Sequence, residues 1–222
     1  MQLFKKYFQA DQSAIELYKV AVKGDPAALA QLRAIGDKGD ATAQSALGFM
    51  YSNGDGVPKY SVQAVFWYRK SAEQGNASAQ YNLGTMYYRG DGVPKDSAQA
   101  VSWYRKSAEQ GYAVAQSALG TMYANGEGVH KDLVQAVFWI RKSAKQGDAD
   151  AQSNLGAMYA RGDGVPKDEV ISYMWRNLAA AQGNEFAKKA REALGASMTP
   201  AQIAKGQRLS REWRPKKPLR LK

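Results

Sequence analysis

The sequence predicts an all-α protein built as a solenoid of tandem helix-turn-helix repeats. Two observations lead to this prediction. A set of residues recurs every 36 positions from residue 43 to residue 186 without insertion or deletion. The apolar residues of each unit also have the spacing of amphipathic helices. One helix pair cannot bury its apolar face alone, so neighbouring units must stack.

The repeated unit contains Ala-Gln, Leu-Gly, Tyr, a Gly-x-Gly-Val loop, Trp, Ala and Gly, in that order. We number its four copies 1 to 4, as residues 43–78, 79–114, 115–150 and 151–186. The four Ala-Gln pairs begin at Ala43, Ala79, Ala115 and Ala151, and the tryptophans are Trp67, Trp103, Trp139 and Trp175.

The first helix of each unit follows from an apolar stripe with i, i+4, i+7 and i+8 spacing, which in copy 2 is Ala79, Leu83, Met86 and Tyr87. Gly84 lies inside this helix, where glycine costs about 1 kcal/mol relative to alanine. Because every copy has glycine there, we expect a neighbouring helix to pack too close for a Cβ.

The loop Gly90-Asp91-Gly92-Val93-Pro94 ends the first helix, since its glycines accept positive φ and its proline stops a helix. Asp96 followed by Gln99 predicts a capping box for the second helix. Copy 1 has Tyr60 at the Asp96 position, so its cap is weaker or shifts to Ser61.

The second helix of copy 2 has a buried stripe formed by Ala100, Tyr104 and Ala108, and Gly111 ends it. In the other copies, Ile140 and Arg176 replace the tyrosine that follows Trp. His130 replaces a loop proline, and Ser172 replaces an alanine.

Residues 79–111 contain the pattern A-x-x-x-L-G-x-M-Y-x-x-G-x-G-V-P-K-D…A-x-x-W-Y-x-K-S-A-x-x-G, which resembles the Sel-1-like repeat (SLR) family, a relative of the tetratricopeptide repeat. Four copies cover 144 of the 222 residues. The resemblance implies a right-handed α/α superhelical solenoid whose first helices line a concave face. It also implies a role as adaptor or scaffold.

We therefore expect four segments. Residues 1–42 form N-terminal capping helices, a degenerate repeat in which Asp25 caps a helix that starts at Pro26. Residues 43–186 form the four repeats. Residues 187–214 form C-terminal capping helices, the last opened by a capping box at Thr199 and Gln202. Residues 215–222 form a disordered basic tail.

The net charge of +11 is concentrated at the C-terminus, because residues 205–222 hold eight basic residues and one acidic residue. The folded body therefore has little excess charge, and we do not expect nucleic acid as its partner. No stretch is apolar enough to span a membrane, and residues 1–10 lack the apolar run of a signal peptide, so the compartment stays open.

Comparison of copies 1 and 2 indicates a variable face. They differ at 10 of 36 positions, and six of the differences lie on the first helix or its extension: Ser45/Tyr81, Ala46/Asn82, Phe49/Thr85, Ser52/Tyr88, Asn53/Arg89 and Ser78/Val114. Their spacing places them on one helical face, opposite the apolar stripe. Either this face recognises a partner, or it is solvent-exposed and drifts neutrally.

We favour recognition, because tyrosine and arginine often dominate binding interfaces and large aromatic residues are costly to leave exposed. The predicted partner-binding residues are Phe49, Asn53, Tyr81, Thr85, Tyr88 and Arg89, with Asn125 and Arg161 extending the groove.

Catalysis is not expected. The chain has no cysteine, its single histidine is His130, and no serine has a lysine three residues later. The Gly-Asp-Gly loops lack the residues of a phosphate or calcium loop. No cofactor or metal is therefore predicted.

The sequence thus predicts a monomeric, non-enzymatic adaptor or scaffold that binds a partner protein or peptide in the concave groove. One alternative is a binder of an anionic surface, nucleic acid or membrane, through the basic tail. Another, suggested by the resemblance to bacterial SLR proteins, is the neutralising partner of a bacterial toxin.

Overall fold

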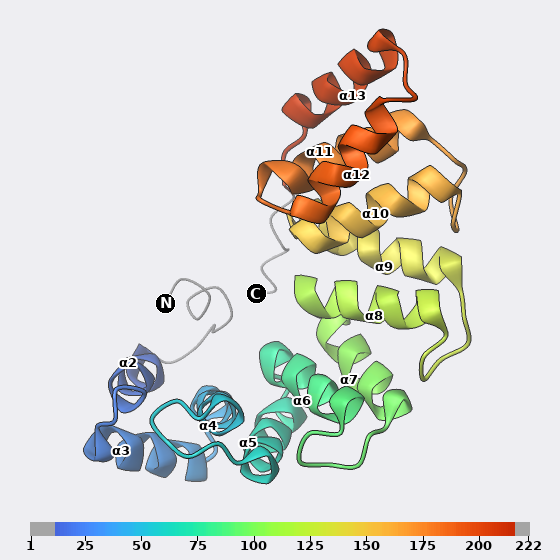
Figure 1. Cartoon of the computed structure of the whole chain (residues 1–222). Coiled ribbons are helices and arrows are strands. Elements are labelled where there is room, and N and C mark those ends of the chain that lie inside the picture. The colour runs from blue at the N-terminus through green and yellow to red at the C-terminus, as the bar shows by residue number, and fades with distance from the viewer. Residues whose placement is uncertain (1–11, 216–222) are drawn as a thin grey trace. The chain divides into compact units, whose positions relative to one another are not determined.

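A computed structural model describes residues 12–215, and these residues form helices joined by turns, with no strand among them (Figure 1). The chain divides into two compact units, Met1–Gln110 and Gly111–Lys222, which we describe separately. The predicted all-α solenoid class is confirmed. Most of the predicted tail, residues 216–222, and the first residues, 1–11, lie outside the described part.

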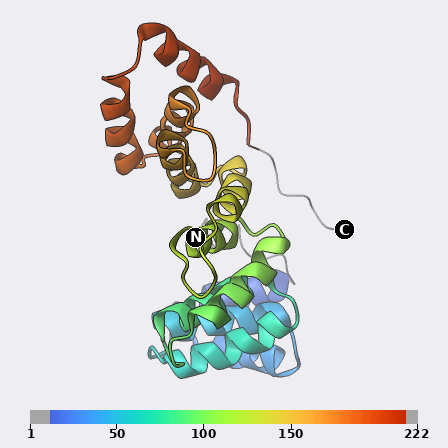
Figure 2. The ribbon, with the colours of Figure 1, turned by 90° about the vertical axis from the view of Figure 1, so that its right-hand side faces the viewer.

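The first unit contains six described helices, which are α2 (Gln12–Ala21), α3 (Pro26–Asp37), α4 (Ala41–Asn53), α5 (Ser61–Glu73), α6 (Ala77–Arg89) and α7 (Ser97–Glu109). The second unit also contains six, which are α8 (Ala113–Asn125), α9 (Leu133–Lys145), α10 (Ala149–Arg161), α11 (Glu169–Ala181), α12 (Glu185–Gly195) and α13 (Pro200–Glu212). Figure 2 shows α4 to α7 stacked side by side in the first unit.

The glycine inside each first helix lies against the second helix of the same repeat, as predicted. An alanine Cβ at Gly48 would lie 2.5 Å from the Tyr68 ring, and one at Gly84 would lie 2.8 Å from the Tyr104 ring. Because Tyr68 and Tyr104 are buried, their rings have little room to move. The glycine therefore sets the close approach of the paired helices.

The loop prediction holds, but the capping box predicted at Asp96 and Gln99 is only half formed, because the Asp96 backbone N–H donates to the Tyr87 carbonyl oxygen and not to the Gln99 side chain. Gly90 ends α6 in the left-handed conformation, with φ of 78°. The Asp96 carboxylate accepts a hydrogen bond from the Gln99 backbone N–H at 2.9 Å, whereas Tyr60 gives α5 no side-chain cap. The second helix of copy 1 thus starts without the cap that copy 2 has.

The buried glutamine at the start of each first helix connects neighbouring helices, a role that the sequence pattern alone did not reveal. Gln80 follows Ala79 at the start of α6 and donates its side-chain amide to the carbonyl oxygen of Ala72 in α5 at 3.0 Å. It also accepts a hydrogen bond from Gln110, at the end of α7, at 2.7 Å. One side chain therefore joins three consecutive helices, which explains the glutamine of the repeated Ala-Gln pair.

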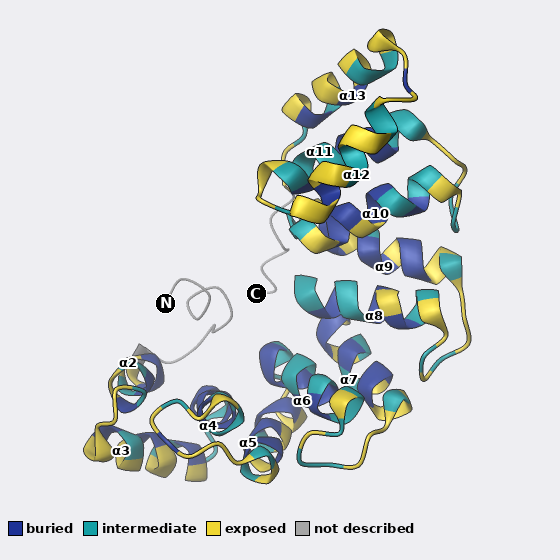
Figure 3. Cartoon of the chain, viewed as in Figure 1, coloured by how far each residue is buried: buried dark blue, intermediate teal, exposed yellow. Residues whose placement is uncertain are grey.

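The helix N-caps predicted at Asp25 and Thr199 are both present. The Asp25 carboxylate accepts hydrogen bonds from two backbone N–H groups of α3, and Thr199 with Gln202 forms a complete capping box on α13. The α13 helix packs on α11, and the rings of Trp213 and Trp175 lie 6.2 Å apart, edge to face. In Figure 3 the buried residues follow the faces where helices meet, while the outer faces of α12 and α13 are mostly exposed.

Candidate binding surfaces

Six of the eight predicted partner-binding residues fall on two surfaces, one in each unit, whereas Phe49 and Asn53 lie on neither. In the first unit, Tyr81, Thr85, Tyr88 and Arg89 of α6 lie over Tyr104 of α7. We call these five residues the tyrosine face. In the second unit, Asn125 and Arg161 line a pocket between α8, α10 and α12, which we call the basic pocket.

The tyrosine face is held in place by Tyr104, which is only 4% exposed. The rings of Tyr81 and Tyr104 lie 5.6 Å apart at an angle of 31°. The Tyr104 hydroxyl lies 3.2 Å from Thr85 Oγ1, within hydrogen-bond distance. Tyr81, Thr85 and Tyr88 are half-buried and Arg89 is exposed, so the face offers ring edges, hydroxyls and a cation to solvent.

Burial raises the pKa of Tyr104 to about 12, although the hydrogen bond with Thr85 lowers it in part. Nearby Tyr81 and Tyr88 raise this pKa further, while the positive charge of Arg89 lowers it. Tyr104 is therefore a neutral phenol at neutral pH. Lys95 Nζ lies 5.7 Å from the centre of the Tyr88 ring, which adds a second cation beside the face.

In copy 1 the expected open face is wrong at Ser45 and Ala46, which are buried at 0% and 1% exposed. The α2 helix packs on α4 and covers this part of it. Phe49 lies half-buried against the same core, with its ring 6.2 Å from that of Tyr18. The N-terminal capping helix thus turns the variable face of copy 1 into core.

The predicted residues at the ends of the first helices contact their own loops. Asn53 Nδ2 donates to the Asp55 carboxylate at 3.3 Å, and Asn125 Nδ2 donates to that of Glu127 at 2.9 Å. Arg161 forms an ion pair with Asp163. In each case the partner lies two residues later, within the Gly-x-Gly loop. These three residues therefore help to hold the loop, besides any contact with a partner.

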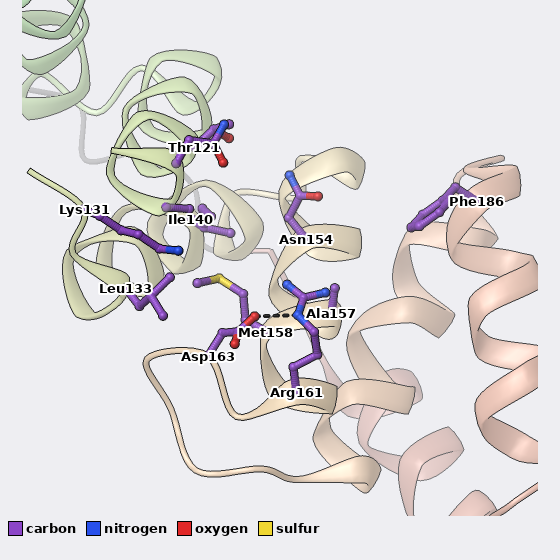
Figure 4. A pocket seen from close by; sticks show the side chains of 12 residues that line it. Thr121, Lys131, Leu133, Ile140, Asn154, Ala157, Met158, Arg161, Asp163 and Phe186 are labelled. Carbon is purple, nitrogen blue, oxygen red and sulfur yellow. Dashed lines mark hydrogen bonds and ion pairs between the residues drawn. The ribbon is translucent and has the colours of Figure 1, made fainter. Parts of the chain in front are cut away.

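The basic pocket has a volume of about 410 Å³ and is shown in Figure 4. Apolar and polar side chains of α8, α9, α10 and α12 line it together with two loop residues. They are Thr121, Ala124, Asn125, Lys131, Leu133, Ile140, Asn154, Ala157, Met158, Arg161, Asp163 and Phe186. Phe186 is 71% exposed, a large apolar side chain left open to solvent.

Positive charge gathers beside this pocket. Besides Lys131 and Arg161 in the lining, Arg176 of α11 lies close enough for its charge to interact with that of Arg161. Burial lowers the pKa of Arg176, and the positive charge of Arg161 lowers it further. Arg176 donates to the backbone carbonyl of Ala190 at 3.0 Å. Among residues 12–215, no carboxylate forms an ion pair with Lys131.

Sequence reasoning missed three residues of these surfaces. Tyr104 was predicted only as a core residue, because its place in the apolar stripe gives no sign of what lies above it. Phe186 occupies the same repeat position as Ser78 and Val114, which copies 1 and 2 already show to be variable. Comparison of all four copies would therefore have found it. Lys131 gives no such signal, because Lys59, Lys95 and Lys167 occupy the same position in the other copies.

The chain matches the model of the Sel1 repeat at residues 41–76, 77–112, 113–148 and 149–184. No helix in the described part of the chain is long and apolar enough to cross a membrane. Among curated proteins, no relative matches the sequence.

Solved structures of similar proteins include a protective antigen of uropathogenic Escherichia coli that displays an SLR fold. It is 35% identical with a TM-score of 0.83, over 90% of this chain and 45% of the antigen chain. This chain therefore spans less than half of that antigen's length. A Sel1 repeat protein from Oxalobacter formigenes is 33% identical with a TM-score of 0.77, over 90% of this chain and 80% of its own.

A more distant match is an immunity protein from Pseudomonas aeruginosa, which is 20% identical with a TM-score of 0.56. The match covers 95% of this chain and 83% of that one. At this identity the likeness shows a shared fold alone.

Proposed function

We propose that this chain, which belongs to the Sel1 repeat family, is a non-enzymatic adaptor or scaffold that binds a partner polypeptide on the faces of its first helices. The proposal includes no catalysis, because the chain has no cysteine and its single histidine, His130, lies exposed in a loop. Repeat proteins of this architecture present an extended surface built from equivalent helices, which suits a polypeptide ligand.

The observation that carries the proposal is the tyrosine face. The Tyr81 ring lies against Tyr104, and Thr85 lies within hydrogen-bond distance of the Tyr104 hydroxyl, so contacts within the chain position both side chains before any partner arrives. A rigid aromatic surface loses little conformational entropy on binding, and tyrosine and arginine supply much of the binding energy at protein interfaces.

A double substitution tests this proposal. Tyr88→Ala with Arg89→Glu removes one ring and reverses one charge at the accessible end of the face, while the contact between Tyr81 and Tyr104 stays intact. We expect this variant to lose a partner that the wild-type protein captures from native lysate. Tyr81 is a poorer choice, because its stacking on Tyr104 also contributes to stability.

A matched control comes from the outer surface of the first unit. Phe66 of α5 is 45% exposed, and Lys70 Nζ lies 4.6 Å from the centre of its ring. Phe66→Ala with Lys70→Glu therefore makes the same kind of change away from the tyrosine face. Capture that survives the tyrosine-face variant but not this control would place the binding site on the second helices instead.

A second candidate is binding of an anionic surface through the basic C-terminal region, because residues 205–222 hold eight of the 31 basic residues. Of these, Lys205, Arg208, Arg211 and Arg214 lie exposed on or just after α13. Truncation after Trp213 separates the two functions. Binding through the tail would be lost and would weaken steeply with salt, whereas binding on the tyrosine face would persist.

A further inference from the structure

The basic pocket is lined by small side chains of copy 3 at positions where one of the earlier copies has an aromatic ring. Thr121 occupies the position of Phe49 in copy 1, and Ala124 occupies that of Tyr88 in copy 2. Ile140 likewise replaces the tyrosine that follows Trp. These residues line a space of about 410 Å³ in the second unit. Spaces of this size hold one or two side chains of a ligand.

The pocket has apolar surface on opposite sides. Met158 and Ile140 are buried at its base, only 4% and 2% exposed. Figure 4 shows Phe186 extending from α12 toward the α10 side chains Asn154 and Ala157. Phe186 packs against little of its own chain, so an apolar ligand group placed against it would bury apolar area that is now in water.

The polar rim of the pocket favours a negatively charged ligand. The lining holds two cations, Lys131 and Arg161, and one carboxylate, that of Asp163, which is paired with Arg161. The nearest other acids are held by their own segments, since Glu127 accepts from Asn125 and Asp132 caps α9. Arg176 lies outside the lining, beside Arg161. Of the charged residues in the lining, Lys131 therefore has no ion-pair partner among the described residues. Arg176 also lies beside another guanidinium, and the repulsion between them would be relieved by a bound anion.

The chain's own ends do not suit this pocket. The segments outside the described residues are basic, with Lys5 and Lys6 in one and Lys216, Lys217, Arg220 and Lys222 in the other. A second copy of the chain has the same net charge of +11 and would be repelled over distance. Charge complementarity therefore points to an acidic partner.

We propose that the basic pocket binds an acidic segment of a partner polypeptide, in which an Asp or Glu carboxylate reaches Lys131 and Arg161 while a neighbouring apolar side chain contacts Phe186 and Met158. This inference rests on the proposed function, because it gives the chemical class of the polypeptide that the first helices bind. It adds a requirement for charge and a definite location in the second unit.

The test measures binding of fluorescein-labelled peptides to the full chain by fluorescence polarisation. The probe is the amidated peptide Asp-Phe-Glu-Leu-Asp, and its neutral counterpart is Asn-Phe-Gln-Leu-Asn. We expect the acidic probe to bind more tightly than the neutral one, with a difference that shrinks between about 0.05 M and about 0.3 M salt. Equal binding of the two probes, or no binding of the acidic probe, would overturn the proposal.

Two substitutions locate the site, and both introduce residues that other copies already contain. Ala124→Tyr fills the pocket with the ring that copy 2 has at Tyr88, and we expect at least about tenfold weaker binding because the apolar contact is blocked. Arg161→Asn removes the charge while keeping a side chain that can hold the loop acid, as Asn53 and Asn125 do. Since Arg161 is exposed, we expect about two- to fivefold weaker binding.

The matched controls make the same changes outside the pocket. Ala160→Tyr makes the change of Ala124→Tyr one copy later. Arg89→Asn makes the change of Arg161→Asn in the first unit. Both should leave peptide affinity within about twofold of the wild-type value. Affinity that falls equally in the controls, or that is unchanged by both pocket variants, would show that the peptide binds elsewhere.

A version of the probe with a free terminal carboxylate distinguishes side-chain from terminal recognition, and tighter binding of that version alone would also overturn the proposal.

The outcomes for this proposal and for the proposed function are separable. If the tyrosine-face variant loses the native partner while the pocket variants keep full peptide affinity, the adaptor function stands and the acidic pocket fails. If pocket variants lose the peptide while no surface variant affects capture of a native partner, the pocket stands and the adaptor function fails.

Discussion

Gly84 determines how closely α6 approaches α7, and replacing it with alanine tests this directly. The new Cβ would lie 2.8 Å and 2.9 Å from two atoms of the Tyr104 ring and 3.2 Å from the Ala100 carbonyl oxygen. The ring has little freedom to move away, because Tyr104 is 4% exposed and its hydroxyl lies within hydrogen-bond distance of Thr85. The helices must therefore separate slightly, or the ring must leave its preferred rotamer.

Two opposing contributions set the size of the effect. Alanine inside a helix gains about 1 kcal/mol over glycine. Inserting a methyl group into a packed core costs about 1–3 kcal/mol. With a rigid ring and a backbone oxygen as neighbours we expect the upper half of that range, so Gly84→Ala should destabilise the fold by about 1–2 kcal/mol. For a chain of this size, the thermal midpoint should then fall by about 2–8 °C.

Thermal unfolding followed by circular dichroism measures this shift, and Gly195→Ala is the control. At Gly195 an added Cβ would have its closest contact 3.6 Å away, at the Tyr173 ring, which is an ordinary van der Waals distance. That control should keep or raise the midpoint. An equal or higher midpoint for Gly84→Ala would refute the close-packing explanation of the repeated glycine.

Three further predictions concern single side chains of the first unit. Because the pKa of Tyr104 is raised, its contribution to stability is complete below pH 10 and is lost as the pH rises through about 12. Tyr104→Phe should therefore reduce the alkaline loss of stability, measured by urea unfolding, by about 2–3 kcal/mol. An unchanged alkaline profile would contradict this. Gln80→Leu leaves the Ala72 carbonyl and the Gln110 amide without their partner. It should lower the free energy of unfolding, measured in urea, by about 1–3 kcal/mol. The control Gln99→Leu, on an exposed surface, should change this free energy little. Tyr60→Asp supplies the missing cap of α5 and should raise stability by about 1 kcal/mol, and a fall in the thermal midpoint would argue against it.

Much of the fold follows from the sequence because the repeat restates the same physical constraints four times. A glycine kept at Gly84 and its equivalents indicates close packing, and the loop glycines indicate positive φ. These are local requirements, and each copy satisfies them with residues close together along the chain. The helices and the end caps could therefore be predicted from residue types and spacing.

The candidate sites could be predicted only in part. The variable face of α6 was identified from copy-to-copy differences, and the structure adds that Tyr104 lies beneath it. The equivalent face of α4 is covered by α2, a contact between segments that share no pattern with each other. Periodicity cannot reveal such a contact, because it describes the repeats and not what packs on their ends.

The sequence by itself determined the repeat, the positions of the helices and the residues that must be small or buried, since these depend on backbone geometry and on interactions within one repeat. Only the tertiary structure decided which variable positions are open. Phe49 is partly buried because a capping helix reaches it, whereas Thr121 and Ala124 leave a pocket because the ring atoms of Phe49 and Tyr88 have no counterpart there. Exposure depends on every neighbour at once, and neighbours from other helices are fixed only when the chain has folded.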